Sequence, residues 1–393
     1  MSATQEAAKA PGPILAPPGL EGVAVAETTI GDVRGEEGFF HYRGYNAAEL
    51  ARECSFEQVW HLLIEGELPN PEQTKKFRAD TIPLRDLPEQ VSDLLPAIAH
   101  IKPFVPLDAL RTAISLVASA AELRPTMDIS AEEVRQQAVR MTAVAPVLLM
   151  AMYRAHQGLE PVAPDPDLGY AASYLQMLTG KRPDEEHSRA VEKYLILTME
   201  HGFNASTFTA RVIASTGADL GSALVGAIGA LSGPLHGGAP SRALQTLDEI
   251  GTADRAYDYL REKVASGERL MGFGHRVYKT DDPRSTLLRE VALELGGEQA
   301  DLAQHVEQTA LMVLNELKPG RRLYTNVEFY AGVVMNTAGI PRDMFTPTFA
   351  CSRTVGWTAA ICEQAGHNRL IRPSAIYVGP PPPQPLPPGY RYV

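Results

Sequence analysis

Apolar residues recur at helical spacing through most of this chain, and this pattern limits its possible folds more than any other feature. Positions i, i+3, i+4 and i+7 form one face of an amphipathic helix. The pattern occupies residues 107–121, 131–155, 185–200, 205–231, 240–250, 253–265, 283–294, 299–317, 327–338 and 345–365. Ser55 with Gln58, and Ser130 with Glu133, have the spacing of capping boxes that open helices. Because no strands alternate with these helices, the sequence argues against a doubly wound nucleotide-binding sheet and predicts an all-α fold.

The two ends of the chain and one short segment depart from the helical pattern. Residues 1–18 are rich in Ala and Pro, which predicts a disordered lead, and the fold is expected to start near Gly19. Residues 23–44 have a β-like pattern interrupted by a glycine-bearing turn, which predicts one short N-terminal β-hairpin. The proline-rich residues 379–388 predict an extended polyproline tail.

The charge balance bears on possible partners. The 393 residues carry a formal net charge of −11. Nucleic acids and anionic membranes are bound through excess Lys and Arg, so neither is expected as a main partner. An anionic ligand would need a local basic pocket.

Cysteine usage and the N-terminal residues bear on location. Cys54, Cys351 and Cys362 are odd in number and lack CxxC spacing, which favours neither a disulfide framework nor a thiolate zinc site. The N-terminus lacks the order of a signal peptide, and we expect no run of about 18 apolar residues able to cross a bilayer. A cytoplasmic protein with no membrane partner is therefore expected.

Three histidines lie in segments rich in small residues. His236 is in Gly233-Pro234-Leu235-His236-Gly237-Gly238, His201 begins His201-Gly202-Phe203-Asn204-Ala205-Ser206-Thr207, and His275 is in Gly272-Phe273-Gly274-His275-Arg276-Val277-Tyr278-Lys279. Glycines permit unusual backbone angles and close ligand approach. Imidazole is the commonest acid/base group near neutral pH, so these three are candidate catalytic residues. A zinc site of three histidines stays open, because metal ligands can lie far apart in sequence.

Arg284, Arg353 and Arg372 are candidate anion ligands. A guanidinium binds a carboxylate in bidentate fashion, so three of them suit a small dianionic acid. The ordinary alternative for each is a surface charge.

Several of these motifs, in order, resemble the citrate synthase family. Together with Gly19-Leu20-Glu21-Gly22-Val23 and Tyr42-Arg43-Gly44-Tyr45, they extend the resemblance over residues 19–380. The resemblance implies an all-helical homodimer whose small domain closes over the substrates. The implied boundaries place the large domain at 19–236 and 334–393, the latter with the proline-rich tail, and the small domain at 237–333.

The resemblance implies an acyltransferase of the tricarboxylic acid cycle. Oxaloacetate condenses with acetyl-CoA through an enol or enolate, and hydrolysis of citryl-CoA then releases citrate and CoA. His236 would stabilise the enolate, His275 would polarise the ketone of oxaloacetate and His201 would contact oxaloacetate. The carboxylate clamps would be Arg284, Arg353 and Arg372. No bound cofactor and no metal are implied, and coenzyme A enters as the thioester co-substrate.

The resemblance also assigns the binding of coenzyme A. The backbone of Arg269, Leu270, Met271 and Gly272 would lie near the adenine. Lys279 would approach a phosphate, and Phe349 would lie close to the acetyl group.

One residue departs from the family pattern. The family's base is usually Asp in an Asn-Val-Asp stretch, whereas this chain reads Thr325-Asn326-Val327-Glu328. Glu328 is therefore the candidate base, and its extra methylene moves the carboxylate by about 1 Å, enough to change the rate about a hundredfold if nothing compensates. We hypothesise that the backbone is set back to suit the longer side chain.

Three other functions remain possible from the sequence. A 2-methylcitrate synthase would use propionyl-CoA, which differs from acetyl-CoA by one methylene. A catalytically weak member of the family would bind oxaloacetate or CoA as a sensor or assembly subunit. A zinc hydrolase would depend on metal.

Overall fold

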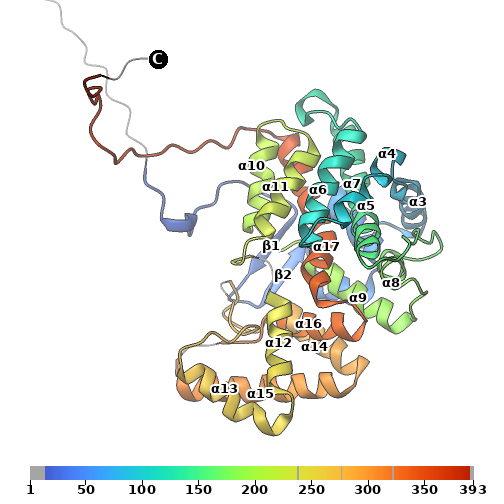
Figure 1. Cartoon of the computed structure of the whole chain (residues 1–393), viewed down its shortest axis with the longest axis vertical. Coiled ribbons are helices and arrows are strands. Elements are labelled where there is room, and N and C mark those ends of the chain that lie inside the picture. Colours follow the sequence, from blue (N-terminus) through green and yellow to red (C-terminus); the bar gives the residue numbers. More distant parts are fainter. Residues whose placement is uncertain (1–13, 237–238, 276, 321–322, 390–393) are drawn as a thin grey trace, which may run out of the picture. The chain divides into compact units, whose positions relative to one another are not determined.

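The computed structural model describes residues 14–236, 239–275, 277–320 and 323–389, and it divides the chain into two units (Figure 1). One unit joins Met1–Glu27 with Leu370–Val393, and the other is Thr28–Arg369. The described residues of the first unit contain a short 3-10 helix, Pro18–Leu20, and no further helix or strand. Most of the predicted lead, residues 1–13, lies outside the described residues.

Helices make up most of the unit Thr28–Arg369, which confirms the predicted all-α class. Their bounds are α1 Ala47–Glu53, α2 Phe56–Glu65, α3 Pro71–Thr81, α4 Glu89–Ser92, α5 Leu95–Ala99, α6 Pro106–Ala120, α7 Ala131–His156, α8 Tyr170–Thr179, α9 Glu185–Thr198, α10 Ala205–Ser215, α11 Leu220–Leu231, α12 Ala239–Ile250, α13 Ala256–Ala265, α14 Pro283–Leu295, α15 Glu298–Leu317, α16 Val327–Thr337 and α17 Phe345–Gly366.

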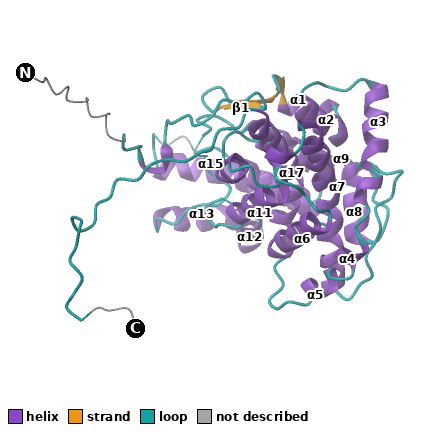
Figure 2. Cartoon of the chain, turned by 90° about the horizontal axis from the view of Figure 1, so that it is seen from above, coloured by secondary structure: helices purple, strands orange, loops and turns teal. Residues whose placement is uncertain are grey.

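Three short antiparallel strands lie beside the helices (Figure 2). They are β1 Gly31–Arg34, β2 Phe39–Tyr42 and β3 Tyr45–Asn46. Strands β1 and β2 pair from Gly31 opposite Tyr42 to Arg34 opposite Phe39, which confirms the predicted hairpin. Strand β3 extends it by a second, two-residue pairing.

Both predicted capping boxes are present. The Ser55 hydroxyl accepts the Gln58 N–H, and the Gln58 side chain accepts the Ser55 N–H, at the start of α2. Ser130 and Glu133 exchange the same bonds at the start of α7. These reciprocal bonds satisfy amide groups that have no partner within the helix.

The helix predicted over 205–231 is wrong in its continuity. Gly217 has a φ of +80° and divides the segment into α10 and α11. The Asp219 side chain then caps α11 by accepting the Ser222 N–H. A left-handed residue followed by a strong N-cap ends one helix and starts the next.

Helices α7 and α17 form the centre of the core. They pack on each other, and the buried side of α17 also contacts α10, α11 and α9. By length and composition α7 could cross a membrane, because an 18-residue window has a mean hydropathy of 1.2. The expectation of no such segment is therefore wrong, but 78% of that window is buried inside the protein, as in a core helix.

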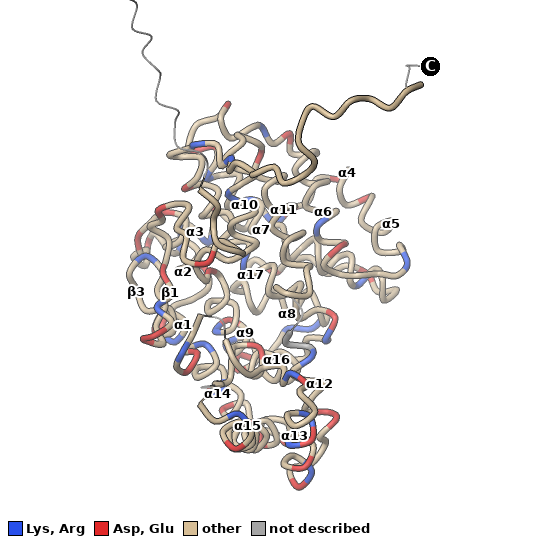
Figure 3. Tube along the Cα trace, turned by 90° about the vertical axis from the view of Figure 1, so that its left-hand side faces the viewer, with Lys and Arg blue, Asp and Glu red and all other residues tan. Residues whose placement is uncertain are grey.

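Helices α12 to α16 gather at one end of the unit Thr28–Arg369 (Figures 1 and 3). Helix α14 packs on α16, α13 on α15, and α12 on α16. Acidic and basic residues are interspersed along α13 and α15 (Figure 3). These helices fall within the predicted small domain, residues 237–333, whose boundaries stay a prediction.

Candidate active site

Backbone bonds join the His275 loop to the start of α16. Phe273 and Thr325 form an isolated antiparallel bridge, and the Gly274 N–H donates to the Tyr324 carbonyl at 2.7 Å. The Asn326 side chain donates to the Gly274 carbonyl at 3.0 Å. The loop that holds His275 and the helix that holds Glu328 therefore form one local structure.

Gly272 allows the His275 loop to pack closely against the start of α16. Its carbonyl accepts the Asn326 N–H at 2.9 Å, and its φ is +87°. A Cβ at this position would lie 3.0 Å from the Cβ and Cδ2 atoms of Phe329 on α16. A side chain is therefore disfavoured at position 272 both by the backbone angle and by the packing.

The tautomer of His275 follows from its hydrogen bonds. Its Nδ1 accepts the N–H groups of Val277 and Tyr278 at 2.9 and 3.0 Å, so a neutral ring carries its hydrogen on Nε2. Burial, followed by the positive charge of Arg284, lowers the pKa of His275 to about 4. His275 is thus a neutral hydrogen-bond donor at neutral pH.

The donor atoms of His275 and Arg284 face each other. His275 Nε2 lies 3.3 Å from Arg284 Nη2. Because both atoms carry hydrogen, their arrangement suits an oxygen acceptor that both can reach. An anionic or polarised oxygen of a substrate would fulfil this role.

Asp282 fixes the orientation of the Arg284 guanidinium. The carboxylate accepts Arg284 Nε at 3.0 Å and Nη2 at 2.8 Å, and both side chains are buried. One of its oxygens also accepts the Val327 N–H at 3.1 Å. Asp282 therefore connects the guanidinium to the first residue of α16.

His201 packs beside His275. The two rings meet edge to face with centroids 5.8 Å apart, and His201 Nε2 lies 3.0 Å from the Tyr278 hydroxyl. Burial and then the charges of Arg284 and Arg353 hold the pKa of His201 well below its usual value. The three aromatic side chains form one cluster of neutral hydrogen-bonding groups.

A hydroxyl network determines the tautomer of His236. Ser206 Oγ donates to Asn204 Oδ1 at 2.8 Å and accepts the Trp357 Nε1–H at 3.0 Å. Its remaining lone pair faces His236 Nε2 at 2.8 Å, so Nε2 donates and Nδ1 is left as an acceptor. For Nδ1 to donate to an enolate, the Ser206 hydroxyl must turn and donate to Nε2.

The charge state of His236 is also set by its surroundings. Burial, followed by the positive charge of Arg353, lowers the pKa of His236 to about 4. The ring is therefore neutral at physiological pH, as a neutral stabiliser of an enolate requires.

Arg353 is a buried cation on α17. Its Nε donates to the Thr198 carbonyl at 2.7 Å, and its guanidinium lies 4.4 Å from the centre of the Phe349 ring. Burial lowers the pKa of Arg353 to about 10, while the nearby Glu200 opposes this. In the described part of the chain Arg353 forms no salt bridge, which suits it to a substrate carboxylate.

Glu328 is the second residue of α16, and its N–H donates to the Asn326 cap at 3.1 Å. Burial raises the pKa of Glu328 to about 7, against the opposing charges of Arg284 and Arg269. A carboxylate whose pKa is near the working pH is an efficient general base.

The other predicted site residues have varied positions. Arg372 is exposed and belongs to the unit of the two chain ends, whereas the other predicted site residues belong to Thr28–Arg369. Among the predicted CoA ligands, Arg269 and Lys279 are exposed and Leu270 is buried. Met271 is half-buried.

Sequence reasoning missed four residues that organise the site. Ser206 and Tyr278 lie within the histidine segments, and Asp282 precedes Pro283 at a helix start, so each had a local signal. Trp357 is distant in sequence and had none.

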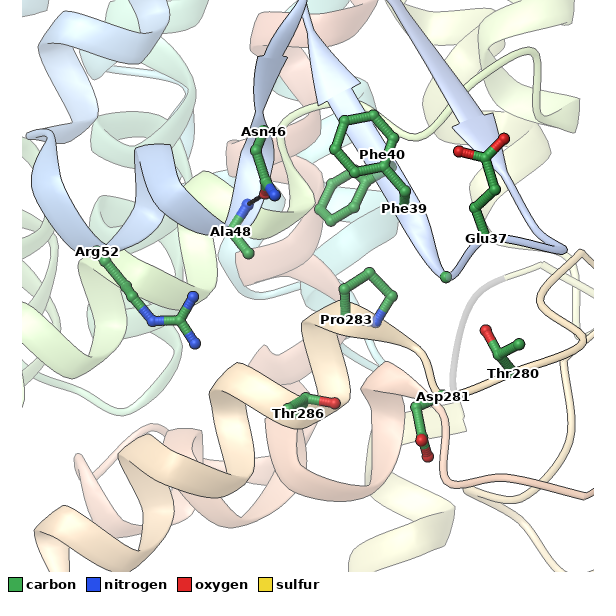
Figure 4. A pocket seen from close by; sticks show the side chains of 11 residues that line it. Glu37, Phe39, Phe40, Asn46, Ala48, Arg52, Thr280, Asp281, Pro283 and Thr286 are labelled. Carbon is green, nitrogen blue, oxygen red and sulfur yellow. Dashed lines mark hydrogen bonds between the residues drawn. The ribbon is translucent and has the colours of Figure 1, made fainter.

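A pocket of about 410 Å³ lies between the hairpin strand β2 and the start of α14 (Figure 4). Phe39, Phe40 and Pro283 line it together with Arg52 and Thr286. The ring of Phe40 also contacts that of His201, with centroids 5.6 Å apart.

No cluster of three His, Cys, Asp or Glu side chains is arranged to hold a metal ion within residues 14–236, 239–275, 277–320 and 323–389.

Comparisons with known proteins agree on one family. Residues 19–374 match the family model described as citrate synthase, C-terminal domain. Citrate synthase from Deinococcus radiodurans is 39% identical over 369 residues, which cover 92% of this chain and 95% of that protein.

Solved structures give the same result. Citrate synthase from Pyrobaculum aerophilum superposes with a TM-score of 0.86 at 36% identity, covering 98% of this chain and 99% of that one. The ternary complex of carboxymethyl coenzyme A and oxaloacetate with citrate synthase from Thermoplasma acidophilum has a TM-score of 0.85 at 28% identity, covering 94% and 97%.

Proposed function

Because this chain belongs to the citrate synthase family and catalyses the condensation of oxaloacetate with acetyl-CoA, we propose that Glu328, His236 and His275 are its catalytic residues. The observation that carries this assignment is the pair of donors, His275 Nε2 and Arg284 Nη2, 3.3 Å apart and joined through Asp282 to the helix of Glu328. A ketone or carboxylate oxygen suits the donor pair.

Oxaloacetate is bound first in the proposed reaction. Its ketone oxygen accepts a hydrogen bond from His275, and a carboxylate beside it binds Arg284. Arg353 binds the second carboxylate, and His201 adds a neutral contact. Arg372 is the third proposed carboxylate ligand. Because it belongs to the unit of the two chain ends, its place beside the other ligands stays a prediction.

Enolisation follows. Glu328 removes a proton from the acetyl methyl group, and the electrons of that C–H bond move to the thioester carbonyl oxygen. With the Ser206 hydroxyl turned towards Nε2, His236 donates from Nδ1 to this oxygen and stabilises the developing charge.

Carbon–carbon bond formation completes the condensation. The enolate carbon attacks the ketone carbon of oxaloacetate, and the ketone oxygen takes the Nε2 proton of His275. His275 then regains a proton from water and Glu328 releases the methyl proton, which returns both groups to their starting states. Water then cleaves the thioester of citryl-CoA, which gives citrate and CoA. Arg284 stays protonated throughout, because its buried partner Asp282 stabilises the cation.

Coenzyme A is proposed as a substrate rather than a resident cofactor. The carboxymethyl coenzyme A complex of the Thermoplasma acidophilum enzyme supports this assignment. Arg269 to Gly272 and Lys279 are the proposed contacts with its nucleotide portion, and Phe349 with its acetyl end. A 2-methylcitrate synthase is not favoured, because the relatives are named citrate synthases.

We further propose a cytoplasmic homodimer acting in the tricarboxylic acid cycle. The free thiols Cys54, Cys351 and Cys362 support a reducing compartment. The homodimer rests on the family resemblance, and light scattering should give about twice the 42.6 kDa chain mass.

One assay tests the proposed chemistry. Purified protein with oxaloacetate and acetyl-CoA should release free CoA thiol, and Glu328→Gln should abolish most of this release. Propionyl-CoA should give a lower kcat/KM than acetyl-CoA. Full activity of Glu328→Gln would show that the base is wrongly assigned, and a chelator-sensitive rate would support the zinc alternative.

A further inference from the structure

A buried carboxylate, Glu307 on α15, binds the chain on both sides of Glu328. We propose that Glu307 is a positioning residue, which holds the first turn of α16 so that Glu328 reaches the substrate methyl group. This inference rests on the proposed role of Glu328 as the base. It concerns a residue that lies outside every motif of the site.

The contacts of Glu307 are short and specific. Its Oε1 accepts the Thr325 hydroxyl at 2.6 Å, and its Oε2 accepts the Tyr330 hydroxyl at 2.6 Å. Thr325 precedes Glu328 by three residues, and Tyr330 follows it by two. The side chain of Glu307 is 6% exposed, so water does not compete for these bonds.

The geometry of α16 places Glu307 behind the base. Residues two apart on a helix point to nearly opposite faces, so Tyr330 and Glu328 project in different directions. Glu307 thus binds the side of the first turn of α16 that carries Tyr330, and the side that carries Glu328 stays available to a substrate. Tyr330 is fully buried, which leaves its hydroxyl little freedom to change partner.

A third helix joins the same carboxylate. Arg289 on α14 places Nη1 3.4 Å from Glu307 Oε2. The second residue of α14 is Arg284, whose partner Asp282 accepts the Val327 N–H. Glu307 on one side and Asp282 on the other therefore fix the start of α16 between α14 and α15.

The position of this turn matters because Glu328 has one more rotatable bond than the usual Asp. A misplacement of about 1 Å at a reacting group can cost about a hundredfold in rate. A carboxylate that accepts two hydroxyl donors is well suited to hold the backbone, since bonds to a charged acceptor are the stronger ones.

The test is Glu307→Gln in the full-length protein. An amide oxygen can accept one of the two hydroxyls, and the amide nitrogen cannot accept the other. We expect kcat for condensation to fall about 10-fold to 100-fold. The KM for oxaloacetate should stay within about twofold, and calorimetric titration of oxaloacetate should give an unchanged stoichiometry and affinity.

Glu316→Gln is the matched control. Glu316 lies on the same helix and also contacts a tyrosine hydroxyl and an arginine, Tyr257 and Arg261, but it is exposed and away from α16. Its kcat should equal that of the wild type.

Two results would overturn the proposal. One is a Glu307→Gln kcat within about twofold of the wild type, and the other is a loss of oxaloacetate binding in proportion to kcat, which indicates general damage. If Glu307→Gln does not fold, Tyr330→Phe and Thr325→Val each remove one hydroxyl and should show the same pattern with a smaller loss. If the wild type is active, Glu328→Gln is inactive and Glu307→Gln has a normal kcat, only the proposed role of Glu307 is wrong. If the wild type itself has no activity, the proposed function is wrong.

Discussion

Asp282 binds Arg284 with both carboxylate oxygens, at 3.0 Å to Nε and 2.8 Å to Nη2. The aspartate also accepts the backbone N–H of Val327, where α16 begins. One buried carboxylate therefore orients both Arg284, a proposed substrate ligand, and the helix that carries Glu328, the proposed base.

The first prediction concerns this ion pair. Asp282→Asn leaves the Arg284 charge buried without its partner, so the free energy of unfolding should fall by about 3 kcal/mol or more. Denaturant unfolding measures this, and the KM for oxaloacetate should rise. Asp248→Asn is the control, because the exposed pair of Asp248 with Arg342 should contribute about 1 kcal/mol or less. Equal losses in the two variants would contradict the assigned role of Asp282.

The second prediction concerns the hydroxyl beside His236. Ser206→Ala removes the group that must donate to Nε2 before Nδ1 can donate to the enolate. We expect kcat to fall about 100-fold, as for the loss of one oxyanion donor. Steady-state kinetics with saturating oxaloacetate checks this. Ser119→Ala, which removes an exposed helical hydroxyl bonded to the Ser115 carbonyl, should leave kcat unchanged.

The third prediction is the pH dependence of the rate. Glu328 must be ionised to accept a proton, and burial raises its pKa to about 7. The value of kcat/KM for acetyl-CoA should therefore fall as the pH decreases below about 7. The pKa values of His236 and His275 are about 4, so both rings stay neutral across this range. A rate that stays constant from pH 8 down to about pH 5 would contradict Glu328 as the titrating base.

The fourth prediction concerns the closest backbone contact of the site. Gly272→Ala introduces a Cβ 3.0 Å from Phe329 at a φ of +87°. Gly267→Ala is the matched control, because its φ is +85° and no atom lies within 4 Å of the added Cβ. The control should lose about 1 kcal/mol of unfolding free energy from the backbone angle. Gly272→Ala should lose about 1 to 3 kcal/mol more from overpacking and should also lower kcat. Urea unfolding of both variants separates the two contributions.

Helical periodicity predicted most of the helices because each buries one continuous face. It failed at Gly217, where a single left-handed residue interrupts an apolar pattern that otherwise continues. It also missed α8, which begins after Gly169 without a side-chain cap, and the short helices α1, α4 and α5. The error at Gly217 concerns local backbone conformation, which the spacing of apolar residues does not report, and the short helices offer too few residues to show a period.

Candidate site residues could be proposed from sequence where one segment held the whole signal. The glycine-rich surroundings of His201, His236 and His275 singled out these three histidines, and the structure brings the rings of His201 and His275 together. Their catalytic roles stay a prediction. Glu307 was not predictable, because it lies in an ordinary amphipathic helix and acquires its contacts only when α15 packs on α16. Long-range packing of this kind leaves no local mark in the sequence.

The bridge between Phe273 and Thr325 has a consequence for how the enzyme admits its substrates. In the proposed mechanism the proton donor to the ketone, His275, and the acceptor of the methyl proton, Glu328, lie on two backbone segments that are hydrogen-bonded to each other. A movement that opens the cleft would therefore transport acid and base as a single rigid body. Their mutual spacing would survive every cycle of opening, and closure would have to align only the substrates against it.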